Sequence, residues 1–478
     1  MKPTVAGQGE AQAVSAEQSF SARQVLASLS LSMLLSSLST SIANVGLPTL
    51  AQAFGASFQA VQWVVLAYLL AVTTLIVSAG RLGDLVGRRR LLLAGLTLFT
   101  LASILCGLAP TLWLLIAARA AQGLGAAVMM ALTMAFVSDT VPKEKTGSAM
   151  GLLGTMSAIG TTLGPSLGGA LIAGFGWRAI FLINVPLGLL TLLLAYRYLP
   201  ADRPRQPERA GFDHPGTLLL ALTLAAYALA MTLGRGSFGA LNVALLSAAL
   251  IGAGVFVLVE GKASSPLVRL KMFDNPVLSA GLATSVLVST VMMTTLVVGP
   301  FYLAGAFGLQ AALVGLVLSV GPLVAAFTGV PAGRIADRFG AERMIFVGLA
   351  GIAAGCFLLS LLPDGIASYV ASLAIMTGGY AVFQAANNTT VMTDIQPQQR
   401  GVVSGMLNLS RNLGLITGAS VMGAVFALAS SAHDVATAQP NALAMGMRIT
   451  FAIGGMLMIL ALAIALGGRV LALKSVGR

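Results

Sequence analysis

Two arginines stand inside long apolar runs of this 478-residue chain, and their chemistry opens the question of function. Arg119 lies in the run 112–137, and Arg411 lies in the run 401–429 beside Asn408 and Asn412. Arginine keeps its proton inside proteins, so each would order water, hold an anion or shift the pKa of a neighbour. The alternative is structural, with the guanidinium bonding helix carbonyls. Both alternatives stay open, and the structural one carries more weight for Arg411, which is expected nearer the cytoplasmic half of the membrane.

Other polar and aromatic side chains are predicted at similar depth. Asn44 follows Thr40 by four residues, and Asn388 follows Gln384 by four, so each pair shares one helical face. Aromatic rings nearby would add walls to a binding site. The residues expected to contact a bound small molecule are Ser39, Thr40, Asn44, Trp63, Tyr68, Arg119, Gln122, Tyr380, Gln384, Asn387, Asn388, Asn408 and Arg411.

The positions of the acidic residues do not indicate a catalytic site within the membrane. None of the 15 falls near the middle of an apolar run, and both histidines, His214 and His433, lie outside the runs. No nucleophile–base pair or metal cluster is therefore predicted, no Walker motif is present, and neither a cofactor nor a metal is expected. Three acids at run ends remain as candidates for proton coupling: Asp139, Glu260 and Asp394.

The composition explains where these residues must sit. Apolar residues make up 57% of the chain, charged residues only 9%, and the mean hydropathy is +0.92. A soluble domain carries roughly 25% charge, so lipid is predicted to be the solvent. The net charge of +12 comes from short basic clusters between apolar runs. That pattern is typical of membrane loops and excludes a nucleic-acid partner.

A bilayer core requires about 20 apolar residues per helix. The chain contains fourteen such runs, which predicts an all-α integral membrane protein. Their expected bounds are 23–47, 60–79, 91–109, 112–137, 147–173, 179–199, 216–233, 240–260, 277–304, 311–331, 343–361, 366–391, 401–429 and 446–467.

The basic residues test this topology. With the N-terminus in the cytoplasm, 22 of the 27 lysines and arginines fall on the inner side, and only Arg178, Arg235 and Arg448 fall outside. The other two are Arg119 and Arg411, within the runs. This asymmetry follows the positive-inside rule, so we expect a multi-pass protein of a bacterial inner (plasma) membrane with both termini cytoplasmic.

The chain also repeats itself. Gly80-Arg-Leu-Gly-Asp84-Leu-Val-Gly87 recurs as Gly333-Arg-Ile-Ala-Asp337-Arg-Phe-Gly340, and four glycines from Gly147 to Gly164 recur from Gly401 to Gly418. Two copies of a six-helix unit separated by two inserted helices would produce this spacing. We expect a tail (1–22), a first bundle (23–199), a linker with two helices (200–276), a second bundle (277–467) and a tail (468–478).

These motifs resemble the major facilitator superfamily, and its fourteen-helix drug:proton antiporter branch in particular. The segments that carry the resemblance are Gly80–Arg90, Arg119-Ala-Ala-Gln122-Gly123, Gly160-Thr-Thr-Leu-Gly164-Pro165-Ser-Leu-Gly168-Gly169, Leu38–Pro48 and Trp63–Tyr68. The resemblance implies the major facilitator fold, alternating access and proton-driven efflux of amphipathic, often cationic, compounds. The implied partners are a small-molecule substrate, the bilayer and protons, and we expect a monomer.

Two of the motifs have physical interpretations of their own. Asp84 and Asp337 are expected at helix starts, where a carboxylate can cap backbone N–H groups. With Gly80, Gly87, Arg88, Gly333 and Gly340 they would form a conformational latch, unless they serve only as topology anchors. Gly160, Gly164, Gly168 and Gly169 allow close backbone approach, and Pro165 would bend its helix. The second copy has Ala419-Ser420 at the Pro165-Ser166 position, so any such bend is expected in the first half alone.

The resemblance fails at one informative position. The antiporter branch has an aspartate where this chain has Ser39, and a serine does not exchange a proton near neutral pH. The leading interpretation is a secondary exporter of small amphipathic molecules, with proton antiport. The alternative is an uncoupled or uptake transporter of a neutral or anionic molecule.

Overall fold

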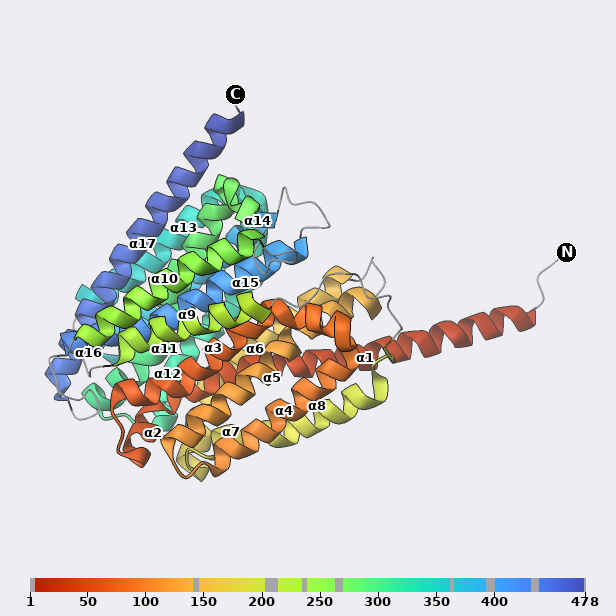
Figure 1. Ribbon diagram of the computed structural model, residues 1–478, viewed down its shortest axis with the longest axis horizontal. Coiled ribbons are helices and arrows are strands. Elements are labelled where there is room, and N and C mark those ends of the chain that lie inside the picture. The colour runs from red at the N-terminus through yellow and green to blue at the C-terminus, as the bar shows by residue number, and fades with distance from the viewer. Residues whose placement is uncertain are drawn as a thin grey trace.

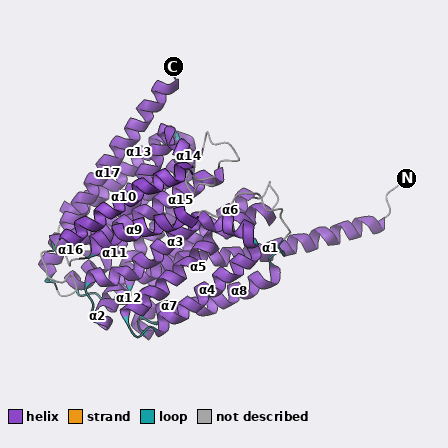
Figure 2. Cartoon of the chain, viewed as in Figure 1, coloured by secondary structure: helices purple, strands orange, loops and turns teal. Residues whose placement is uncertain are grey.

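The computed structural model describes residues 5–140, 146–202, 214–233, 239–262, 270–361, 365–392, 400–430 and 438–476. Within these ranges the chain is helical and contains no strand (Figure 2). Fourteen segments of the described residues are long and apolar enough to cross a bilayer, which confirms the predicted number. They belong to α1 (Val5–Val45), α3 (Phe58–Val86), α4 (Arg88–Leu108), α5 (Leu112–Thr140), α6 (Thr146–Phe175), α7 with α8 (Ala179–Leu182, Asn184–Tyr198), α9 (His214–Thr232), α10 (Ala240–Lys262), α11 (Pro276–Phe307), α12 (Ala311–Phe339), α13 (Ala341–Leu361), α14 (Ile366–Met392), α15 with α16 (Arg400–Thr417, Gly423–Ala429) and α17 (Pro440–Val476).

The helices form two bundles and a separate pair. Helices α1 to α8 pack chiefly on one another, as do α11 to α17. The inserted helices α9 and α10 pack together, and α9 lies against α3, as Figure 1 shows. Most of α10 faces outward, since only 11% of its apolar 18-residue stretch is buried within the protein. The two related bundles with two inserted helices are therefore confirmed, while the exact domain boundaries stay a prediction.

One short helix was not predicted. α2 (Leu47–Phe54) follows α1 after Gly46, begins with Pro48 in its first turn and ends at Gly55 in the left-handed conformation with φ 56°. Proline near the start and glycine after the end are the usual limits of a helix. We call the end of the molecule that holds α2 and the 308–310 turn the distal end. The opposite end, where the α1 span begins and α17 ends, is the terminal end.

The repeated motif has the same corner in each half, but its aspartates are not where we expected. Gly87 and Gly340 separate consecutive helices with φ values of 106° and 89°. Asp84 and Asp337 lie in the last turns of α3 and α12 rather than at helix starts. The expected position at helix starts is therefore wrong, because both helices continue past the aspartates up to the glycine corner. The side chains of Asp84 and Asp337, and with them the expected capping role, lie outside the described residues.

A different carboxylate caps α4. Asp202, which follows α8, accepts hydrogen bonds from the backbone N–H groups of Arg89 at 2.8 Å and Arg90 at 3.2 Å. A Cβ on Gly87 would meet this carboxylate, so the corner has to be glycine for two reasons. The Arg89 side chain completes the contact by donating to the Tyr196 carbonyl.

The second half has an irregularity where the first has Pro165. Pro165 lies inside α6. The matching residues Ala419 and Ser420 lie in a π-helical turn, η3 (Gly418–Met422), between α15 and α16. A π turn, like a proline, interrupts the regular hydrogen-bond pattern of a helix. Both halves therefore have an irregular position at this place, while the expected bend at Pro165 stays a prediction.

Candidate functional site

Arg119 is the centre of a buried polar cluster in the first half. Its Nε donates to the Val64 carbonyl on α3 at 2.9 Å, and Nη1 donates to Ser39 Oγ on α1 at 3.1 Å. Nη1 also donates to Gln122 Oε1 one turn along α5, and Gln122 Nε2 donates to Ser103 Oγ on α4. Arg119, Gln122 and Ser39 are all 0% exposed. The cluster therefore ties four helices together.

An aromatic wall covers this cluster. The guanidinium carbon of Arg119 lies 4.3 Å from the Tyr68 ring centroid and 5.9 Å from that of Phe181, distances at which a ring attracts a cation. Tyr68 donates its O–H to the Ser36 carbonyl, and Thr40 Oγ1 donates to the Tyr68 hydroxyl oxygen at 3.3 Å. These contacts position the ring over the guanidinium. Five of the expected site residues, namely Ser39, Thr40, Tyr68, Arg119 and Gln122, are thus brought together.

The expected residues of the second half lie apart from this cluster. On α14, Tyr380 and Gln384 are half-buried and Asn388 is exposed, at intervals of four residues. Asn408 and Arg411 are half-buried on α15.

Two expected residues of the first half also lie outside the cluster. On α1, Asn44 donates to the carbonyls of Thr40 and Ser41 in its own helix. Trp63 faces α9 and donates its indole N–H to Thr232.

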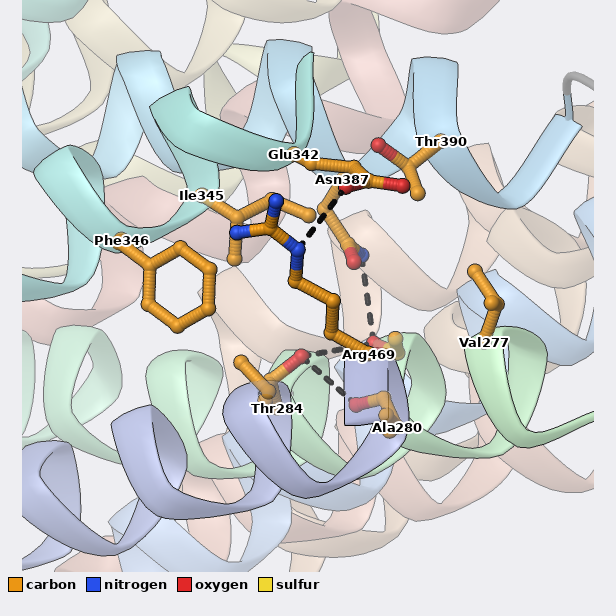
Figure 3. Close-up of a pocket in the computed structure, with 12 residues that line it drawn as sticks. Val277, Ala280, Thr284, Glu342, Ile345, Phe346, Asn387, Thr390 and Arg469 are labelled. Carbon is orange, nitrogen blue, oxygen red and sulfur yellow. Dashed lines mark hydrogen bonds and ion pairs between the residues drawn. The ribbon is translucent and has the colours of Figure 1, made fainter. Parts of the chain in front are cut away.

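Asn387 belongs to a pocket within the second bundle. It is 2% exposed, and its Nδ2 donates to the Gly281 carbonyl at 3.2 Å. Figure 3 shows it beside the side chain of Arg469, whose Nε lies 3.4 Å from Glu342 Oε2. The cavity here has a volume of about 50 Å³. It lies among α11, α13, α14 and α17 near the terminal end, which separates Asn387 from the Arg119 cluster.

The two halves meet at the distal end. Phe58 on α3 packs edge-on against Phe301, with centroids 4.7 Å apart, and against Phe426 at 5.9 Å. Gln62 Nε2 donates to the Ala419 carbonyl at 2.9 Å. These aromatic and amide contacts join α3 to α11, α16 and η3. Residue type alone did not single out Gln62, because its partner is a backbone carbonyl 357 positions away.

The packing of α6 on α12 changes along its length. Three residues of α12, spaced seven apart, share one face: Gly315, Pro322 and Gly329. A Cβ on Gly315 would meet the Pro165 carbonyl on α6, and the Pro322 carbonyl accepts from Thr162 at 3.2 Å. A Cβ on Gly329 would meet nothing within 4 Å, and the same holds for Gly154 on α6. The two helices therefore touch toward the distal end and leave open space toward the terminal end.

The proton-coupling candidates are not near Arg119. Asp139 and Asp394 have side chains outside the described residues, and Glu260 is 3% exposed near the end of α10. At 1.5 Å per residue, Asp139 lies roughly 30 Å along α5 from Arg119. Of the latch residues, Gly80 and Gly333 have open space at the Cβ position. Arg88 reaches the Ala135 carbonyl on α5 at 3.4 Å. The side chains of Asp84 and Asp337 lie outside the described residues.

This architecture of two joined bundles with polar groups between membrane helices defines a polytopic membrane transporter. The family model "Major Facilitator Superfamily" matches residues 29–419, and the chain belongs to that superfamily. It is a transporter and not an enzyme.

Named relatives and solved structures agree with this assignment. The chain is 33% identical over 390 residues to the multidrug resistance protein Stp of Mycobacterium tuberculosis, covering 81% of this chain and 72% of Stp. It is 31% identical over 405 residues to the riboflavin transporter RibZ of Clostridioides difficile, covering 84% and 88%. A bacterial homologue of the human lysosomal transporter Spinster, solved in an inward-facing conformation, superimposes with a TM-score of 0.70 at 16% identity over 94% of this chain and 97% of that one.

Proposed function

We propose that this transporter exports small amphipathic molecules by alternating access, with both termini in the cytoplasm of a bacterial cell. The face of Gly315, Pro322 and Gly329 is the observation that carries this proposal. Contact at its distal part and open space at its terminal part are what two bundles produce when they tilt against each other. With cytoplasmic termini, the structure is the inward-facing state.

The substrate path is proposed to run between the bundles. Its walls would be the half-buried side chains Thr40, Tyr380, Gln384, Asn408 and Arg411. Fully buried Asn44 and Asn387, which hydrogen-bond to helix carbonyls, would shape the walls from behind. The names of Stp and RibZ place drug resistance and riboflavin transport among relatives, and we propose a small amphipathic compound as the substrate of this chain.

The electrostatics favour a neutral or anionic substrate over a cation. The sequence has no Asp or Glu between residues 24 and 83 or between 85 and 138, so the membrane spans of α1, α3, α4 and α5 offer no carboxylate to a cationic drug. Arg411 is half-buried on α15. Riboflavin, a neutral fluorescent compound, is therefore the first probe, and ethidium is the cationic comparison.

Proton antiport is the proposed energy source, with the coupling acid at the terminal end rather than beside Arg119. Among the candidates Asp139, Asp394 and Glu260, Glu260 is the one with a described side chain, and its burial at 3% exposure suits a group that gains and loses a proton. The alternative is uncoupled transport, favoured by Ser39 at the helix-1 position where an acid would act.

Substrate flux across proteoliposome membranes tests both the proton coupling and the preference for a neutral substrate. We expect riboflavin to accumulate in inside-out vesicles faster when the lumen is acidic, and Glu260→Gln to reduce this acceleration without abolishing downhill flux. Equal flux with and without the pH gradient would exclude antiport and leave the uncoupled alternative. Flux of ethidium but not riboflavin would overturn the electrostatic argument.

A further inference from the structure

Arg119 carries a charge that its protein neighbours do not neutralise. Its Nε and Nη1 donate to a carbonyl, a hydroxyl and an amide oxygen, all of which are neutral. Along the helices that contact Arg119, the nearest acids in sequence are Asp84, 20 residues after Val64, and Asp139, 20 residues after Arg119 itself. A lone buried cation costs several kcal/mol unless an opposite charge accompanies it.

The same guanidinium also has unused hydrogen-bond donors. Nη2 is fully buried and finds no acceptor among the residues that the structure describes. Arginine has five N–H donors, and the three contacts above use those of Nε and Nη1. A water molecule would satisfy Nη2 but would leave the charge unbalanced. A monovalent anion would satisfy both requirements.

We infer that Nη2 of Arg119 is one side of a binding site for a small inorganic anion of halide size. The size limit follows from burial: Arg119, Ser39 and Gln122 have no exposed surface, and Tyr68 has 1%. A substrate-sized molecule has no route to Nη2 in this state. The inferred anion is thus a resident counter-ion of the first bundle. The inference does not depend on which compound is exported.

Ser39 provides the means to test the site. Its hydroxyl lies 3.1 Å from Nη1, so Ser39→Asp places a fixed carboxylate beside the guanidinium and removes the need for a mobile anion. Ser39→Asn is the matched control, because it has nearly the same size as aspartate and no charge.

The experiment measures thermal unfolding of the full-length detergent-purified protein in sodium chloride, bromide or gluconate at equal ionic strength. We expect chloride and bromide to raise the unfolding midpoint of the wild type along a saturable curve, since a ligand of the folded state stabilises it. Ser39→Asn should retain this dependence. In Ser39→Asp the apparent halide affinity should fall at least tenfold.

Two results would overturn the inference. One is a wild-type midpoint that is the same in halide and gluconate, which is the outcome expected if water alone occupies the site. The other is an undiminished halide dependence in Ser39→Asp. If Ser39→Asp fails to fold, radioactive chloride binding to the wild type decides: about one saturable site per chain is expected, and none contradicts the inference.

Discussion

Ser39 Oγ accepts a hydrogen bond from Nη1 of Arg119 across 3.1 Å, and this contact joins α1 to α5 in the interior of the first bundle. With the bond from Nε to Val64 on α3 and the link through Gln122 to Ser103 on α4, the arginine connects helices that are far apart in the chain. The shape of the Arg119 guanidinium group, as well as its charge, is therefore needed to hold these helices together.

Arg119→Lys should destabilise the protein although the charge is kept. A lysine has one nitrogen and cannot reach Val64, Ser39 and Gln122 at once. Losing at least one hydrogen bond to a charged group costs about 1.5–3 kcal/mol, measured as a lower unfolding midpoint in detergent. Arg178→Lys is the control, because Arg178 is exposed and stacks on Trp177. Equal unfolding midpoints for the two variants would contradict a stabilising role of the Arg119 hydrogen bonds.

Gly315→Val should reduce transport at least tenfold, whereas Gly254→Val, at an exposed position on α10, should have little effect. Gly315 lies against the Pro165 carbonyl on α6, where an added Cβ has no room, whereas a Cβ on Gly254 would meet nothing within 4 Å. The valine would keep the distal end from closing. Riboflavin flux at matched expression measures this, and similar losses at both positions would refute the tilting interface.

Gln62→Leu should shift the protein away from the state with a closed distal end. The variant loses the hydrogen bond to Ala419 across the halves, worth about 0.5–1.5 kcal/mol, which changes a two-state population roughly two- to tenfold. The reporter is Gly329→Cys, whose labelling by a maleimide should slow. Native Cys106 and Cys356 are buried and give little background.

The control for this shift is Ser78→Ala. Ser78 bonds to Thr217 on α9 and makes no contact across the two bundles in the hydrogen bonds seen here. With Gly329→Cys as the reporter, Ser78→Ala should be labelled at the same rate as the protein that carries Gly329→Cys alone. Slower labelling in Ser78→Ala as in Gln62→Leu would show that the effect is not specific to the distal contact.

Asp202→Asn should weaken the start of α4 by about 1 kcal/mol, the usual cost of losing a helix cap. The amides of Arg89 and Arg90 lose a charged acceptor, so their hydrogen exchange should accelerate. Asp274→Asn, at an exposed position, serves as the comparison. Unchanged exchange at Arg89 and Arg90 would mean that the capping contact contributes nothing.

A disulfide between α9 and α3 should be tolerated. Ser78 Oγ and Thr217 Oγ1 are 3.0 Å apart, and Trp63 bonds Thr232 near the other end of α9. With two attachments along its length, α9 should move with the first bundle. Ser78→Cys/Thr217→Cys should therefore transport riboflavin equally before and after oxidation. Activity lost on oxidation and restored by a reductant would show that α9 moves against α3.

The sequence was sufficient for the fold because lipid imposes a simple rule on helix length and loop charge. Fourteen spans and two bundles follow from apolar runs and a repeat. The short helix α2 was missed because eight residues are too few to stand out beside runs of twenty. The π turn at Gly418–Met422 was missed because its residues are compatible with a regular helix.

The site was only partly predictable. Ser39, Thr40, Tyr68, Arg119 and Gln122 were identified because polar and charged residues at membrane depth require partners. Asp202 was missed because its partners are backbone N–H groups more than a hundred residues away. Asp84 was assigned a cap for the same lack of distance information: a carboxylate near a glycine corner can lie on either side of it, and sequence does not say which helix continues.

Gly87 and Gly340 also bear on how the chain arose. The two corners have nearly the same backbone shape, yet different residues hold them: Asp202 binds the N–H groups beside one, while Glu342 beside the other contacts Arg469. A duplicated ancestor would have passed on the glycine to both copies, because no other residue adopts that φ at low cost. The charged residues beside the two corners could change without altering the backbone conformation. The two halves thus share the glycine at the corner between helices, whereas the charged residues beside the corner differ.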